Sequence, residues 1–154
     1  MFLQIAGGVL ALGIAIYFIF LILYKKKSDS IKEEVLALLK DYGSMSFNGK
    51  EILFSTKTTT YQILFFYVPL FAELTINSKT KWEINKGGTS QLIDQSSFLS
   101  SDKEKLVIIY PTTIQIKRYI NENEMVFIKP SDHFYQMHLI FKSELNNFLS
   151  EGIL

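Results

Sequence analysis

An uncharged hydrophobic run opens the chain. Residues Phe2–Tyr24 contain no Asp, Glu, Lys or Arg, and Gln4 is the only strongly polar side chain among them. A helix of this length extends about 34 Å, which exceeds the roughly 30 Å of hydrocarbon in a bilayer. Lipid offers no partners to backbone N–H and C=O groups, so a spanning segment must be helical. The pattern predicts a transmembrane helix.

Three lysines, Lys25, Lys26 and Lys27, follow this run directly. The positive-inside rule places such a basic flank in the cytoplasm, with the N-terminus outside. No basic residue precedes the run and no A-x-A pattern follows it, which favours a retained signal anchor over a cleaved signal peptide. We therefore expect a membrane anchor at residues 1–27 and one cytosolic domain at residues 28–154 of a single-pass cell-membrane protein. The lysines could also contact anionic lipid headgroups, but topology alone accounts for them.

Small residues recur every four positions in the anchor, at Gly7, Ala11 and Ala15. This spacing places them on one helix face, where two helices can approach closely. It suggests self-association, although Gly and Ala are also common in membrane helices generally.

Helical periodicity resumes after a short polar link at residues 27–30. Ser30 and Glu33 fit a capping box, and apolar residues then repeat at helical spacing up to Gly43. We expect a helix over residues 31–42 whose apolar stripe faces the domain core rather than lipid.

The middle of the chain has the pattern of an antiparallel group of strands. Asn48-Gly49 between apolar runs is a hairpin signal, and the almost continuously apolar residues 61–68 indicate a strand buried on both faces. Further strands are expected at 51–56, 72–77 and 82–85, with turns at 78–81 and at Gly87-Gly88. Residues 89–104 are compatible with a loose helix or an ordered loop.

The last third predicts a β-α-β unit. Short apolar runs at 106–110 and 125–128 flank a segment in which Thr112 or Thr113 caps a helix carrying Ile116 and Ile120. A strand over 134–141 and a helix capped by Ser143 complete the chain. The fold class is thus α+β: the anchor helix, then one domain with a mixed sheet, a C-terminal β-α-β unit and flanking helices.

Composition excludes several functions. Subtracting the three flanking lysines from 16 basic residues leaves 13 against 15 acids, so the domain is near −2, and no nucleic-acid partner is indicated. The absence of cysteine excludes disulfides, thiolate nucleophiles and cysteine zinc sites. Abundant Ile, Lys, Asn, Phe and Tyr point to an AT-rich, bacterial source.

Candidate chemistry is sparse. The two histidines, His133 and His138, are an odd number of residues apart, so on one strand they point to opposite faces and cannot share a metal without a break between them. We predict no metal and no cofactor. No nucleophile elbow or P-loop is present, so no catalytic residue is assigned.

The expected order of a helix, three strands, a helical segment and another strand resembles that of restriction-endonuclease-like domains. Those nucleases hold Mg²⁺ with a strand acid and an Asp/Glu-x-Lys pair. Here Glu83 and Lys86 have one residue too many between them, and Gln115-Ile116-Lys117 lacks the carboxylate. The resemblance therefore implies a phosphate-handling enzyme or an inactive relative, as the alternative to a binding module.

One segment combines basic and aromatic residues. Lys79, Lys81 and Lys86 lie near the only tryptophan, Trp82, and such a cluster can bind phosphate, nucleic acid or lipid headgroups. A hairpin with solvated lysines and a core tryptophan explains the same residues.

Our hypothesis is a binding or scaffolding module held at the membrane, which meets a protein partner or lipid. Enzymatic activity stays open, with the missing catalytic set favouring a non-enzyme. A binding module predicts an exposed apolar or aromatic patch that is larger than the patches on an ordinary monomer surface. An enzyme predicts that acids such as Glu51, Glu73 and Glu83 converge with Lys86.

Overall fold

The computed structural model describes residues 2–152, with side chains for residues 12–152. It divides into two compact units, residues 1–37 and residues 38–154. This division falls inside helix α1, and the functional boundary predicted after Lys27 stays a prediction. We call residues 38–154 the C-terminal unit. The class is α+β, with two mixed sheets and three helices among the described residues.

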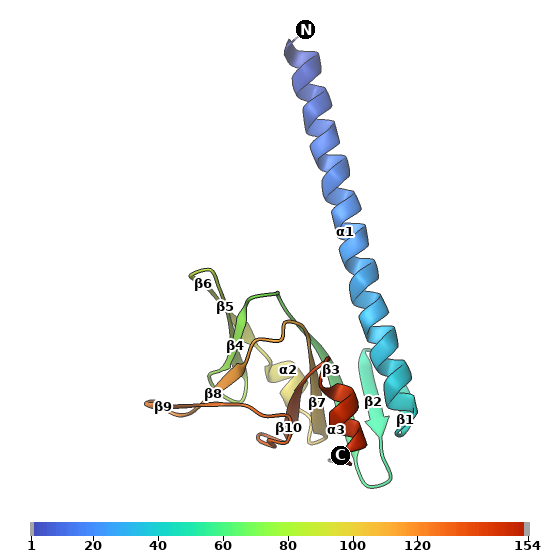
Figure 1. Cartoon of the computed structure of the whole chain (residues 1–154), viewed down its shortest axis with the longest axis vertical. Helices are drawn as coiled ribbons and strands as arrows, with labels where there is room; N and C mark the ends of the chain where they lie inside the picture. Colours follow the sequence, from blue (N-terminus) through green and yellow to red (C-terminus); the bar gives the residue numbers. More distant parts are fainter. Residues whose placement is uncertain (1, 153–154) are drawn as a thin grey trace. The chain divides into compact units, whose positions relative to one another are not determined.

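Helix α1 (Phe2–Lys40) is continuous (Figure 1). The polar link predicted at residues 27–30 and the N-cap predicted at Ser30 are wrong, because both positions are helical. Residues 25–30 contain neither Gly nor Pro, and extending an existing helix costs less than nucleating a new one. The helix ends near Gly43 as predicted: the Gly43 N–H donates to the Leu39 carbonyl at 3.1 Å.

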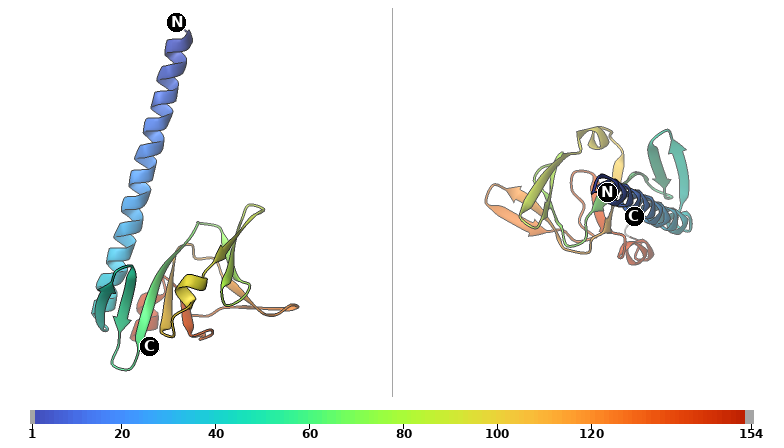
Figure 2. Two further views of the ribbon diagram at one scale, coloured as in Figure 1. Left: turned by 180° about the vertical axis from the view of Figure 1, so that it is seen from behind. Right: turned by 90° about the horizontal axis from the view of Figure 1, so that it is seen from above.

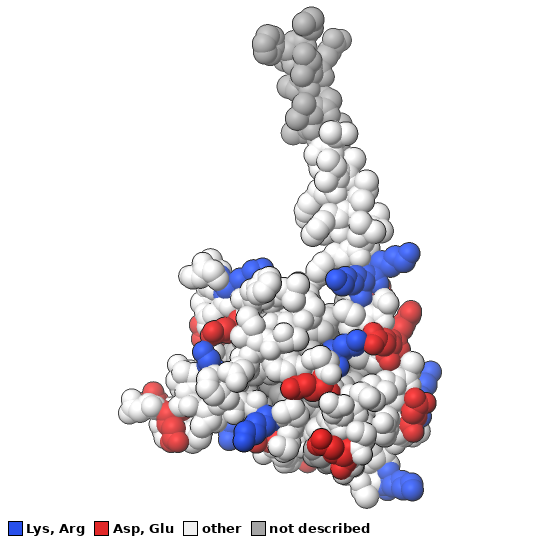
Figure 3. All heavy atoms as spheres, in the orientation of Figure 1, with Lys and Arg blue, Asp and Glu red and all other residues white. Residues whose placement is uncertain are grey.

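Large apolar side chains cover α1 from Leu12 to Tyr24, and each is 42–66 % exposed. Figure 3 shows no charged atoms on the described part of the helix that precedes Lys25. Among the described residues, no helix has an apolar stretch of the length needed to cross a bilayer. Gly7 and Ala11 are described as helical backbone only, while Ala15 is exposed.

The first sheet of the C-terminal unit has the order β1-β2-β3-β7-β10. The β1–β2 and β2–β3 pairs are antiparallel, and the β3–β7 and β7–β10 pairs are parallel. Its strands are β1 (Ser44–Asn48), β2 (Glu51–Ser55), β3 (Thr60–Val68), β7 (Glu104–Pro111) and β10 (Met137–Phe141). The expected hairpin at Asn48-Gly49 is confirmed, with Gly49 at φ 59°. The expected central strand is also confirmed, because β3 is the middle of this sheet.

The second sheet has the order β6-β5-β4-β8-β9, in which only the β4–β8 pair is parallel. Its strands are β4 (Glu73–Ile76), β5 (Lys81–Lys86), β6 (Thr89–Asp94), β8 (Ile116–Asn121) and β9 (Glu124–Phe127). Two short helices, α2 (Ser96–Leu99) and α3 (Leu145–Ser150), complete the unit. Figure 2 shows the β1–β2 and β8–β9 hairpins at opposite sides of the C-terminal unit.

The single mixed sheet that we expected is therefore two sheets. Adjacent parallel strands β3 and β7 both reach a proline, Pro69 and Pro111, and the chain then continues into β4 and β8, which pair in the second sheet. Because β3 and β7 are apolar on both faces, the second sheet covers a surface that one sheet would leave in water.

The predicted β-α-β unit is wrong. The segment assigned to its helix contains strand β8, and β9 pairs antiparallel with β8 rather than parallel with β7. Ile116 and Ile120 fit helical spacing, but short apolar segments are ambiguous, and β-branched and aromatic residues favour a strand once β4 offers a partner. Residues 89–94 also form a strand, β6, and α3 has Glu144 rather than Ser143 at its N-cap.

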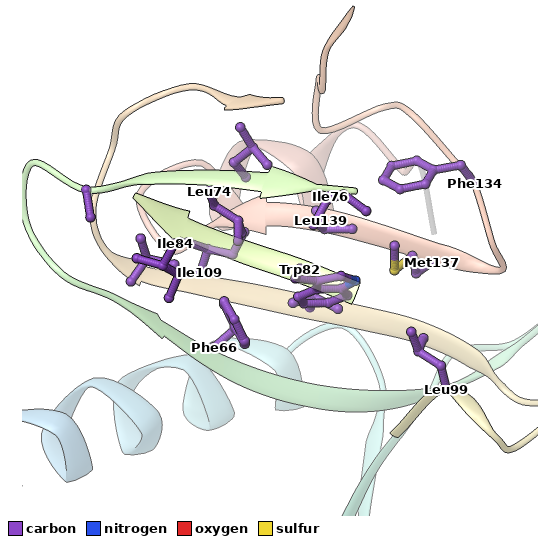
Figure 4. Packing of buried hydrophobic residues seen from close by; sticks show 14 residues of the cluster. Phe66, Leu74, Ile76, Trp82, Ile84, Leu99, Ile109, Phe134, Met137 and Leu139 are labelled. Atoms are coloured by element: carbon purple, nitrogen blue, oxygen red, sulfur yellow. The ribbon is translucent and has the colours of Figure 1, made fainter. Parts of the chain in front are cut away.

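The main core lies between the two sheets. It gathers inward-facing side chains of β3, β7 and β10 with those of β4, β5 and β8. Figure 4 shows Trp82 at its centre, with the Phe66 ring 5.0 Å away in an edge-to-face arrangement. Such aromatic pairs add to the free energy gained from burial.

Candidate functional site

The structure separates the predicted lysine–tryptophan cluster. Trp82 has no exposed surface, and its Nε1–H donates to the Lys79 carbonyl at 3.2 Å, so its ring belongs to the core. Lys79 lies in the turn before β5, and Lys81 and Lys86 stand at opposite ends of that strand, roughly 17 Å apart along it. Lys81 pairs with Asp94 of β6 at 2.5 Å. A hairpin with solvated lysines and a core tryptophan therefore describes this segment, and a ligand role for Lys79, Lys81 or Lys86 stays a prediction.

The acids that an enzyme would need do not form one cluster. Glu51 belongs to the first sheet and is 3.2 Å from Lys103. On the second sheet, Glu73 pairs with Lys117 at 2.9 Å. Glu83 accepts hydrogen bonds from Asn77 and Ser90, which lower its pKa. This arrangement gives no support to the phosphate-handling alternative.

The two histidines meet, contrary to our expectation. The ring centroids of His133 and His138 are 4.8 Å apart. The predicted single strand over 134–141 is interrupted, because Tyr135 and Gln136 have φ of 51° and 60° and β10 begins only at Met137. The turn reverses the alternation of faces that an unbroken strand would impose.

The environments of these two rings differ. His133 Nε2 lies 2.8 Å from a Glu104 oxygen at the surface. His138 is buried, its Nδ1 has no hydrogen-bond partner, and burial together with the nearby His133 lowers its pKa. No group of three or more metal-ligating side chains occurs within the described part of the chain. The two rings therefore differ in burial and in their hydrogen-bond partners.

A buried lysine was missed by the sequence analysis. Lys105 is 1 % exposed, and its Nζ donates to the Ser101 carbonyl at 2.8 Å, to Ser101 Oγ at 2.9 Å and to the Lys103 carbonyl. Ser101 Oγ in turn donates to Gln62 Oε1 at 2.8 Å. Burial lowers the pKa of Lys105. All three N–H donors of the ammonium group thus bind the loop before β7. The only hint of this burial in the sequence was a lysine at the start of an apolar strand.

Two other features concern exposed apolar residues. On the outer face of β8 and β9, Tyr119 lies opposite Met125, and Phe127 lies opposite Lys117. Tyr119, Met125 and Phe127 are 37 %, 46 % and 54 % exposed. Lys117 also lies over the Phe127 ring at 5.9 Å. These three side chains form a small exposed patch of two aromatic residues and one methionine.

The second apolar feature is the turn between β3 and β4. Leu70 and Phe71 are 50 % and 81 % exposed, and Phe71 has a left-handed φ of 63°. The Ala72 N–H closes the turn on the Pro69 carbonyl at 3.0 Å. A second hydrogen bond comes from Thr112 Oγ1, which donates to the Ala72 carbonyl at 3.3 Å. The turn is therefore anchored, while its two largest side chains project from it.

These observations define an α+β protein with two mixed five-stranded sheets, two apolar surface features and an exposed apolar stretch of helix α1. Comparison with protein-family models, with curated proteins and with solved structures gave no match. Its function is therefore argued from its own residues.

Proposed function

We propose that this chain is a single-pass membrane protein whose C-terminal unit is a binding or scaffolding module on the cytosolic side. The observation that carries the proposal is the uncharged run Phe2–Tyr24 followed by three exposed lysines. The large side chains of its described part, from Leu12 onward, are 42–66 % exposed. Such a surface is unfavourable in water and favourable in hydrocarbon.

Membrane attachment is tested by fractionation. Cell membranes carrying the full chain are washed with alkaline carbonate, which removes peripheral proteins. The full chain should stay in the pellet. The double variant Ile16→Lys/Ile19→Lys should move to the supernatant, since each central lysine costs about 2.5–3.5 kcal/mol on insertion. The matched control Leu92→Lys/Met125→Lys changes exposed residues of the second sheet and should stay in the pellet.

The orientation has its own test. The chain has no cysteine, so Glu122→Cys in the β8–β9 turn supplies a unique thiol. A membrane-impermeant maleimide should label it only after the membrane is permeabilised. Labelling in intact cells would place the unit outside and contradict the proposed topology.

The binding role rests on the patch formed by Tyr119, Met125 and Phe127. Charged residues are depleted and aromatic residues and Met enriched at the centres of protein interfaces. Crosslinking in intact membranes should give an adduct of the full chain that Phe127→Glu abolishes. The matched control Phe47→Glu changes an exposed phenylalanine on edge strand β1 and should keep the adduct. Equal loss in both variants, or no adduct at all, would contradict this role.

Self-association through Gly7, Ala11 and Ala15 stays a prediction; the same crosslinking of Ala11→Leu tests it.

A further inference from the structure

Strand pairing brings three connecting segments of the C-terminal unit to one end of the second sheet. Glu73, at the start of β4, lies opposite Asn85 near the end of β5. Leu74 lies opposite Ile116, at the start of β8. The turn at 69–72, the β5–β6 turn at 86–89 and the segment 112–115 are therefore neighbours. We call these three segments the apolar end.

The apolar end has a distinctive charge pattern. Its twelve residues, PLFA, KGGT and TTIQ, contain a single charged side chain, Lys86, which is exposed. The nearest acid, Glu73, is paired with Lys117. The opposite end of the same sheet carries the acids Glu122 and Glu124, together with Lys79 and the Lys81–Asp94 ion pair. An end without unpaired acids, with one lysine, matches the negative surface of an anionic bilayer.

Leu70 and Phe71 are the exposed large apolar side chains at this end, beside exposed polar residues such as Thr89 and Thr113, and Leu and Phe are residue types that enter lipid interfaces. Leu70 and Phe71 project from a turn that hydrogen bonds from Ala72 and Thr112 hold in place. Phe71 adopts a left-handed φ, which glycine or asparagine tolerates better. Because an 81 % exposed ring gains nothing from the protein core, the fold offers no internal compensation for phenylalanine at this position.

We propose that the apolar end inserts Leu70 and Phe71 into the headgroup region of the membrane that anchors the chain, so that the C-terminal unit has a second, peripheral attachment. This inference rests on the proposed membrane anchor. The anchor keeps the C-terminal unit close to the bilayer, so its effective concentration at the membrane surface is high. Two apolar side chains can then maintain a contact that would be too weak for an untethered domain.

The test places a fluorescent probe at one cysteine of the full chain, reconstituted alone in vesicles of phosphatidylcholine and phosphatidylglycerol. Leu70→Cys carrying the environment-sensitive dye NBD reports the turn and leaves Phe71 intact. Ile19→Cys reports the anchor. Glu122→Cys reports the opposite end of the second sheet. Each is compared in vesicles with and without phosphatidylcholine that carries a doxyl quencher on its acyl chain near the headgroup.

Interfacial side chains lie about 5–10 Å into the headgroup and acyl boundary, so about half of the emission at position 70 should be lost to the quencher, and almost none at position 122. Adding Phe71→Ser should largely abolish quenching at position 70 without changing it at position 19.

The other outcomes are equally decisive. Quenching at 19 without quenching at 70 overturns the insertion and leaves the anchor standing. Absence of quenching at 19 overturns the anchor and the insertion together. Equal quenching at 70 and 122 also overturns the insertion, because contact with lipid would then not be specific to the apolar end. Since no other protein is present, a turn that needs a protein partner would remain unquenched and would likewise refute the inference.

Discussion

The imidazole rings of His133 and His138 lie 4.8 Å apart; 46 % of the His133 side chain is exposed to solvent, whereas His138 is buried. Protonating the buried ring would place a charge in a site without a partner for Nδ1 and next to a second titratable ring. Burial is the larger cause of the lowered pKa of His138, and the charge of His133 adds to it.

The stability of the protein should therefore depend on pH. The unfolded chain binds a proton at His138 near the ordinary pKa of about 6.5, whereas the folded chain resists it. The free energy of unfolding should fall as the pH drops below that value. Urea unfolding of the full chain in detergent micelles, followed through Trp82 fluorescence, measures this.

Two variants separate the histidines. His138→Asn should flatten the dependence on pH between 7.5 and 5.5, a window around the ordinary pKa of about 6.5. His133→Asn should leave most of it, because the burial of His138 remains. An unchanged dependence in His138→Asn would assign the effect to other groups.

Phe71 and Leu70 give a matched pair of stability tests. Phe71→Gly should raise the free energy of unfolding by about 0.5–1 kcal/mol, because it relieves the left-handed conformation and loses no core packing. Leu70→Gly, in the same turn but without a positive φ, should lower it by about 0.5–1 kcal/mol. Urea unfolding in micelles measures both. A loss of stability in Phe71→Gly would show that the ring stabilises the folded chain in micelles by more than the strain it causes.

Lys105 should matter more than its neighbour Lys103. Lys105→Met keeps the length of the side chain but leaves the Ser101 and Lys103 carbonyls without their donor, at a cost of about 1–3 kcal/mol. Lys103→Met removes an ion pair with Glu51 in which both side chains are more than a third exposed, so it should cost less than about 1 kcal/mol.

The same unfolding measurement compares these two variants. If Lys105→Met were as stable as the wild type, the cost of burying the ammonium group would equal the gain from its hydrogen bonds. The buried lysine would then contribute nothing to stability.

The sequence pattern predicted a secondary-structure element correctly where a single local requirement, such as burial of both strand faces or a positive φ in a turn, decides its conformation. The run at 61–68 is apolar on both faces, and only a central strand buries both, which is the position of β3. Gly49, Gly87 and Gly88 have positive φ at turns, as their sequence context predicts. The single tryptophan was open to two interpretations, and burial against Phe66 decided between them.

Longer-range features could not be predicted in the same way. Strand β8 has a sequence that also fits a helix, and its pairing with β4 decided the outcome. The meeting of His133 with His138 needed two consecutive non-glycine residues in the left-handed region, a conformation that residue types at 135 and 136 do not signal. The burial of Lys105 depended on carbonyls of a loop that has no characteristic pattern.

The sequence by itself determined an apolar N-terminal helix with a basic flank, an α+β class and the strand at the centre of the first sheet. These follow from composition and periodicity within one segment, where hydrophobic burial acts on neighbouring residues. Only the tertiary structure decided that the strands divide into two sheets, that Leu70 and Phe71 project at an end with a single charge, and that acids such as Glu51 and Glu83 have separate partners. Each of these features depends on which distant segments pair. The free energy that favours one pairing over another comes from contacts throughout the core, so no single segment reveals it.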